Sequence, residues 1–134
     1  MPERFMLDAN VLYSARLRDL FLQLHRNGAA YVYWTQRIEN EWTAALAAGA
    51  AIITLNLAHF PSAALDVHRL TSISPDEALE RLANEDPDRV LQSVRDIRRR
   101  LVNPPLSPSK YADGFEPAGC PGFASGLRER RSEF

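Results

Sequence analysis

Short apolar runs alternate with longer amphipathic stretches along the chain, and this alternation predicts strands separated by helices. Four runs have the length and the β-branched or aromatic residues that are typical of buried strands. They lie near residues 4–8, 31–34, 51–55 and 70–73. After the first run, apolar residues recur every three or four positions, which indicates one helix from Val11 to Arg26. Such alternation builds a parallel sheet by right-handed crossovers, so we expect an α/β fold with the first strand in the interior of the sheet.

The second half of the chain contains two clear helix starts and then a stretch rich in proline and glycine. Ser74-Pro75-Asp76-Glu77 has the form of a capping box, and Asp86-Pro87-Asp88 begins a second helix in the same way. That second helix carries apolar residues on one face and ends before Pro104-Pro105. Proline and glycine recur throughout residues 107–134, so we expect this tail to be largely irregular, apart from a helical turn near residues 123–130.

Composition and charge are those of an ordinary soluble globular protein. Hydrophobic residues make up 46% of the 134 residues, enough for a single core. Sixteen basic and seventeen acidic residues leave a net charge of −1, so no overall positive field favours nucleic acid. The single cysteine, Cys120, cannot form an internal disulfide, and no apolar run approaches the roughly 20 residues of a membrane span. We therefore expect a cytoplasmic protein without a membrane segment or a signal peptide.

Asp8 is the first residue with clear functional potential. It directly follows the apolar run of the first strand, and open α/β sheets place their ligands outside the carboxyl ends of such strands. Asp is also a good N-cap, and for an isolated Asp the start of the following helix is the favoured explanation. The residue pattern around Asp8 leaves both interpretations open.

Four stretches, taken in order, resemble the PIN-domain nucleases, which include the toxins of VapBC-type toxin–antitoxin pairs. These stretches are residues 7–12, 35–42, 47–61 and 74–79. The helix Val90–Leu101 and the Pro-Pro pair after it also look like a C-terminal extension found in one branch of these toxins. The resemblance covers most of residues 4–106.

The resemblance implies a PIN-like three-layer fold, in which a small parallel sheet is flanked by helices. It divides the chain into a shortened PIN-like domain over residues 1–85, a C-terminal helical extension over residues 86–106 and the irregular tail over residues 107–134. The implied activity is that of an endoribonuclease dependent on Mg²⁺ or Mn²⁺. Its partners would be RNA as the substrate, an antitoxin-like protein and a second copy of the chain in a homodimer.

Site residues carry over from the same stretches. Asp8 and Glu41 would hold the metal ion, which is bound weakly, and Asn56 would complete the catalytic set. The residues expected to position the substrate are Asn10, Thr54, Arg98 and Arg99. The arginines near the end of the long helix, from Arg95 to Arg100, are equally well explained as a solvated helix face.

The chain departs from the family pattern in the middle of the domain. Members of the family carry a third acidic motif before the last strand, whereas no acidic residue lies between Glu41 and Asp66 here. Mg²⁺ needs near-octahedral oxygen ligation, and two carboxylates suit one weakly bound ion better than a two-metal site. We therefore expect impaired nuclease activity. The alternative is a catalytically inactive remnant that serves as a protein- or RNA-binding module.

Overall fold

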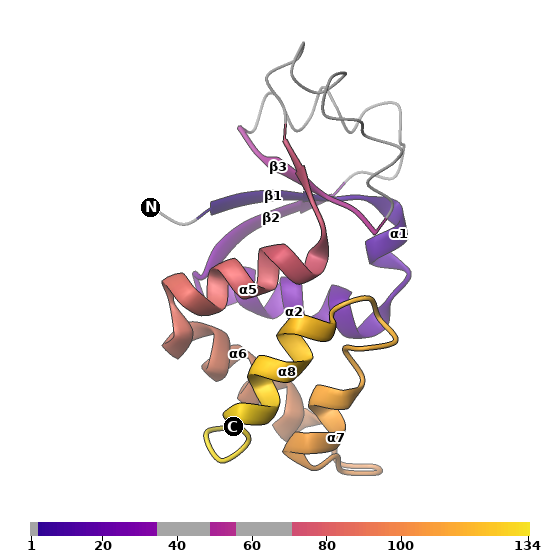
Figure 1. The fold of residues 1–134 in the computed structure, drawn as a ribbon, viewed down its shortest axis with the longest axis vertical. Coiled ribbons are helices and arrows are strands. Elements are labelled where there is room, and N and C mark those ends of the chain that lie inside the picture. The colour runs from indigo at the N-terminus through magenta and orange to yellow at the C-terminus, as the bar shows by residue number, and fades with distance from the viewer. Residues whose placement is uncertain (1–2, 35–48, 56–70) are drawn as a thin grey trace.

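The computed structural model describes residues 3–34, 49–55 and 71–134, which form a parallel sheet with helices packed against it (Figure 1). The four strands are β1 (Glu3–Leu7), β2 (Ala30–Trp34), β3 (Ala51–Ile53) and β4 (Ser72–Ile73). They lie in the order β2-β1-β3-β4, and every neighbouring pair is parallel. The predicted α/β class, the parallel sheet and the interior position of the first strand are confirmed.

The central strand β1 is shielded on both faces of the sheet. Side chains alternate along a strand, so Phe5 and Leu7 point to one face and Met6 to the other. Phe5 and Leu7 belong to the main hydrophobic core. Met6 and its register partner Ile52 are also buried, although they are not part of that cluster. The first strand is therefore apolar because it is buried on both faces of the sheet, as its sequence pattern indicated.

The single helix expected from Val11 to Arg26 is wrong, because the chain forms two helices there. Helix α1 (Ala9–Leu12) is followed by α2 (Ala15–Arg26), and Ser14 between them has an extended backbone. The Ser14 hydroxyl accepts a hydrogen bond from the backbone N–H of Leu17 at 3.4 Å and so starts the second helix. Apolar periodicity runs through both helices, so it does not reveal this break.

Two further helices begin where the sequence predicts. Ser74 caps α5 (Pro75–Glu85) by accepting from the N–H of Glu77 at 3.1 Å. Asp86 caps α6 (Pro87–Arg100) by accepting from the N–H of Arg89 at 3.3 Å. Helices α2, α5 and α6 lie on one side of the sheet (Figure 1). The helix expected over residues 36–48 falls outside the described residues.

The expectation of a largely irregular tail is wrong, because residues 107–134 contain two helices, α7 (Pro108–Asp113) and α8 (Pro121–Glu129). The helical turn expected near residues 123–130 is confirmed as part of α8. Each begins with a proline in its first turn, where the missing N–H has no intrahelical partner to lose, so these prolines start helices here. Tyr111 and Phe123 both pack edge to face against Phe115, with ring centroids 5.4 and 5.1 Å apart. All three rings are buried, so the tail is part of the core.

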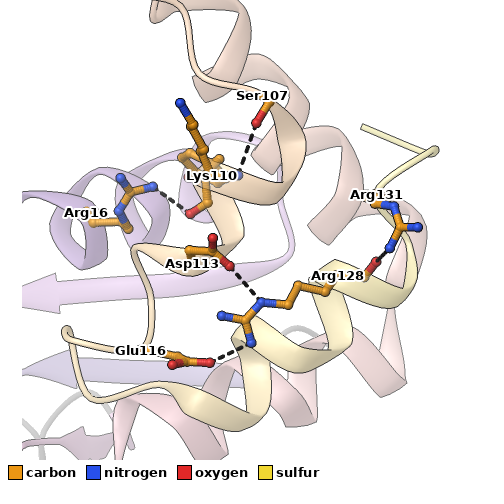
Figure 2. Close-up of polar contacts among 8 residues, drawn as sticks. Arg16, Ser107, Lys110, Asp113, Glu116, Arg128 and Arg131 are labelled. Carbon is orange, nitrogen blue, oxygen red and sulfur yellow. Dashed lines mark hydrogen bonds and ion pairs between the residues drawn. The ribbon is translucent and has the colours of Figure 1, made fainter.

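Polar contacts fasten the two C-terminal helices to each other and to α2 (Figure 2). Arg128 of α8 donates to Asp113 at 2.8 Å and forms an ion pair with Glu116. Arg16 of α2 donates to the backbone carbonyl of Tyr111 at 2.8 Å, and its guanidinium lies 4.7 Å from the centroid of that ring. None of the described helices has the length and apolarity needed to span a bilayer.

Candidate functional site

The strand order creates a topological switch point at the carboxyl edge of the sheet. From β1 the chain moves to β2 on one side, and it later returns to place β3 on the other side of β1. Open α/β sheets bind ligands at such a switch point, where connections from neighbouring strands leave in opposite directions. Asp8 follows β1 directly and donates its N–H to the carbonyl of Ile53 at 2.9 Å. Thr54 directly follows β3, so Asp8 and Thr54 lie at the ends of the two strands that flank the switch point.

The Asp8 carboxylate is buried and held by two hydrogen bonds. Its Oδ2 accepts from the Thr54 hydroxyl at 2.8 Å, and its Oδ1 accepts from the N–H of Ala9 at 2.7 Å. Only 5% of the residue is exposed. The residue therefore caps α1 and also lies at the switch point, and its role in binding a ligand stays a prediction. An ionised carboxylate has about four acceptor positions, so these two contacts leave capacity for a cation.

Asn10 links α1 to the end of β3. Its Nδ2 donates to the Thr54 hydroxyl oxygen at 3.2 Å, and its Oδ1 accepts from the N–H of Leu55 at 3.2 Å. Three residues predicted for the site, namely Asp8, Asn10 and Thr54, are thus brought into one hydrogen-bonded cluster from positions up to 46 residues apart. We refer to these three residues as the switch-point cluster.

The other two members of the expected catalytic set, Glu41 and Asn56, lie outside the described residues. Among the described residues, no group of three or more His, Cys, Asp or Glu side chains could hold a metal ion. The donors of the switch-point cluster are one carboxylate, one hydroxyl and one carboxamide. This oxygen-rich set suits a hard cation such as Mg²⁺, which is often held by one or two carboxylates together with water.

The arginines near the end of α6 bind mainly to their own chain. Arg98 donates to the backbone carbonyls of Leu106 at 3.1 Å and Phe134 at 3.0 Å. Arg100 donates to a glutamine side chain of α2 at 2.9 Å. Arg99 is exposed. Arg98 thus holds the chain on either side of α7 and α8 against α6, and a role of Arg98 or Arg99 in positioning a substrate stays a prediction.

A contact that the sequence did not indicate brings the C-terminal helices to the edge of the cluster. Leu55 follows Thr54, and its Cδ2 atom would lie 2.9 Å from a Cβ added to Gly119. Gly119, in the loop between α7 and α8, has a φ of +90°, a conformation that favours glycine. The two residues are 64 positions apart, so no local pattern could have predicted their contact.

Comparison with known proteins gives a match for this C-terminal part. Residues 75–129 match the model of a family described as the VapC50 C-terminal domain. The match begins at the first residue of α5 and ends at the last residue of α8, so it covers all four C-terminal helices, and the domain boundaries expected after residues 85 and 106 stay predictions. No curated protein and no solved structure matches the chain. The chain is therefore similar, over residues 75–129, to the C-terminal domain of a VapC-type protein, the toxin class that its N-terminal stretches resemble.

Proposed function

We propose that this protein is a VapC-like endoribonuclease of toxin type, with a PIN-type site that requires Mg²⁺ or Mn²⁺ and has low activity. The observation that carries the proposal is the position of Asp8, a buried carboxylate at the switch point of the sheet, hydrogen-bonded to Thr54. The match of residues 75–129 to a VapC C-terminal domain adds independent support for the toxin class. A toxin of this type has an antitoxin-like protein as its partner and can act as a homodimer.

The chemistry of the switch-point cluster suits the proposed reaction. A divalent cation, when bound, lowers the pKa of a water molecule and stabilises charge on the phosphate. In the proposal the Asp8 carboxylate holds that ion together with Glu41, and Asn56 lies near the substrate. The Thr54 hydroxyl and the N–H of Ala9 keep the Asp8 carboxylate in one orientation, which reduces the cost of organising the site around an ion.

The low activity follows from the small number of acidic residues. Two carboxylates neutralise less of the charge of a two-metal site than three or four do, and no acidic residue lies between Glu41 and Asp66. The same absence favours a second candidate function, an inactive remnant of such a nuclease that binds protein or RNA. The two functions differ in whether any metal-dependent cleavage depends on Asp8.

An assay of cleavage of a labelled single-stranded RNA distinguishes the active nuclease from the inactive remnant. It compares wild type, Asp8→Asn and the surface control Asp88→Asn. Asn also caps helices well, so Asp8→Asn removes the charge while it retains the start of α1. We expect slow cleavage that requires Mn²⁺ or Mg²⁺, stops in EDTA, persists in Asp88→Asn and is lost in Asp8→Asn. Absence of metal-dependent cleavage by the wild type would leave the inactive remnant as the function. Equal cleavage by wild type and Asp8→Asn would show that the activity does not come from this site.

A further inference from the structure

Two large aromatic side chains are exposed at the carboxyl edge of the sheet, close to Asp8. Trp34 is the last residue of β2 and pairs in register with Leu7, the residue before Asp8. Neighbouring strands are about 4.8 Å apart, so the backbone of Trp34 lies one strand spacing from Leu7, the residue next to Asp8. Tyr13 follows directly after α1, the short helix that Asp8 caps. Trp34 is 50% exposed and Tyr13 is 88% exposed.

Such exposure leaves apolar surface that a ligand can cover. Apolar surface left in water forgoes about 25 cal/mol per Å², and a tryptophan or tyrosine carries 150–250 Å² that burial could remove. Phe5, Phe21 and Tyr111 are buried, whereas Tyr31 and Tyr33 of β2 are also exposed but point to the opposite face of the sheet from Trp34. Exposed rings beside a candidate site therefore point to a ligand with flat apolar faces.

A guanidinium group lies at the same edge. Arg18 of α2 donates from its NH1 to the carbonyl of Leu12 at 3.4 Å, which brings the positive charge to the backbone beside Tyr13. The side chain of Arg18 is 46% exposed, and within the described part of the chain its ion pair is a long one, at 3.7 Å, with Asp19. Aromatic rings near an accessible cation are the combination that binds single-stranded nucleic acid, through stacked bases and through phosphate contacts. Because the net charge of the chain is −1, stacking must supply a larger share of the affinity than counterion release does.

We propose that Trp34 and Tyr13 form a base-stacking platform for the RNA of the proposed function, so that two unpaired bases stack on these rings and bring the phosphate between them to Asp8. The orientation of the RNA rests on the proposed function, whereas the stacking does not require cleavage. A duplex cannot bind in this way, because its bases are already stacked on one another and are not free to splay out. The platform therefore selects unpaired RNA, such as a loop or a single-stranded end.

Binding of a fluorescently labelled single-stranded RNA in EDTA, followed by anisotropy, tests the platform without cleavage. A stacked base contributes enough that Trp34→Leu and Tyr13→Leu should each raise the Kd about 5- to 150-fold. Trp34→Phe and Tyr13→Phe keep an aromatic face and should bind within a few fold of wild type. RNA should also quench part of the tryptophan emission of wild type, and this part should be missing in Trp34→Phe. Circular dichroism confirms that each variant is folded.

Tyr31→Leu is the matched control. Tyr31 lies on the same strand and is 44% exposed, but it is three residues earlier, about 10 Å from the carboxyl edge, and its side chain points to the other face. Its replacement should leave the Kd unchanged. A duplex of the same sequence should bind at least about tenfold more weakly than the single strand.

Three results would overturn the platform: no RNA binding by wild type, equal binding of duplex and single strand, or an unchanged Kd in both leucine variants. In the last case the exposed rings would belong to a protein interface. Failure of the platform can be distinguished from failure of the proposed function. If cleavage depends on Asp8 but the leucine variants bind RNA normally, only the platform is refuted. Loss of binding in Trp34→Leu and Tyr13→Leu without any metal-dependent cleavage removes only the nuclease and retains the platform.

Discussion

Helix α8 obtains its N-terminal cap from another helix, and removal of that cap should destabilise the whole fold. Asp76 lies in the first turn of α5, and its two carboxylate oxygens accept from the N–H groups of Gly122 at 3.1 Å and Phe123 at 2.8 Å. The N-cap residue of α8 is Cys120, whose side chain makes no capping hydrogen bond. One carboxylate of α5 therefore satisfies two donors at the start of α8 and ties the two helices together.

The structure sets the size of the effect. A hydrogen bond to a charged group contributes about 1.5–3 kcal/mol to stability, and a carboxylate at a helix N-terminus adds about 0.3–1 kcal/mol through the helix dipole. Asp76 is only partly buried, so water can partly solvate the N–H groups of Gly122 and Phe123 when the carboxylate is removed. We therefore expect Asp76→Ala to lower the free energy of unfolding by about 2–3 kcal/mol. Asp76→Asn, which keeps one neutral acceptor, should cost about 1 kcal/mol.

Urea unfolding of wild type, the two Asp76 variants and the control Asp88→Ala measures these changes in the free energy of unfolding. Urea dependences of about 1–3 kcal/mol per molar convert 2–3 kcal/mol into a midpoint shift of about 1 M. Asp88 is an exposed carboxylate in the first turn of α6, so its removal tests the dipole contribution alone and should cost about 0.5 kcal/mol. A shift in Asp76→Ala no larger than that in Asp88→Ala would refute the cross-helix cap.

Three further predictions concern the C-terminal helices. Burial raises the pKa of the Cys120 thiol to about 12, so at pH 8 the native thiol should react with a disulfide reagent at least about a hundredfold more slowly than the urea-unfolded thiol. The free energy of unfolding should also fall as the pH rises from about 9 towards 12, because the unfolded thiol ionises first. Equal reaction rates of the native and unfolded thiols would contradict this prediction. Gly119→Ala should cost about 1–3 kcal/mol because of its positive φ and the contact with Leu55, whereas Gly126→Ala, where an added Cβ meets nothing, should be neutral or stabilising in the same urea assay. Arg128→Met should lower the unfolding midpoint by less than Asp76→Ala does, and 1 M NaCl should remove most of the difference from wild type, unless the ion pairs of Arg128 contribute nothing.

The sheet could be predicted from sequence because its signals are local. Strand β1 is buried on two faces and therefore reads as a continuous apolar run, and the alternation with helices determines the parallel pairing. The break between α1 and α2 depends on one hydroxyl, that of Ser14, in a stretch with unbroken helical periodicity. The prolines at 108 and 121 were ambiguous, because proline ends some helices and starts others, and only packing of the neighbouring rings decides between the two.

The candidate site was predictable in part, for the same reason. Asp8 and Thr54 each directly follow a strand, and parallel strands end at one edge, so their approach follows from the fold class. The carboxylate of Asp76 and the N–H groups that it caps are 46 and 47 positions apart, and their pairing depends on how α5 packs against α8. A single sequence has no pattern that indicates such a distant pair. The predicted roles of Glu41 and Asn56 stay predictions, since both residues lie outside the described part of the chain.

Binding of Mn²⁺ to Asp8 tests the central claim most directly, because it requires neither a known RNA nor turnover. The free ion can be followed by electron paramagnetic resonance while Mn²⁺ is titrated into wild type, Asp8→Asn and the surface control Asp88→Asn. We predict that wild type and Asp88→Asn bind Mn²⁺ with a Kd in the millimolar range, roughly the weak end of oxygen-ligand sites, and that Asp8→Asn loses this binding. Identical titration curves for wild type and Asp8→Asn would contradict the account, because the switch-point cluster would then hold no metal ion.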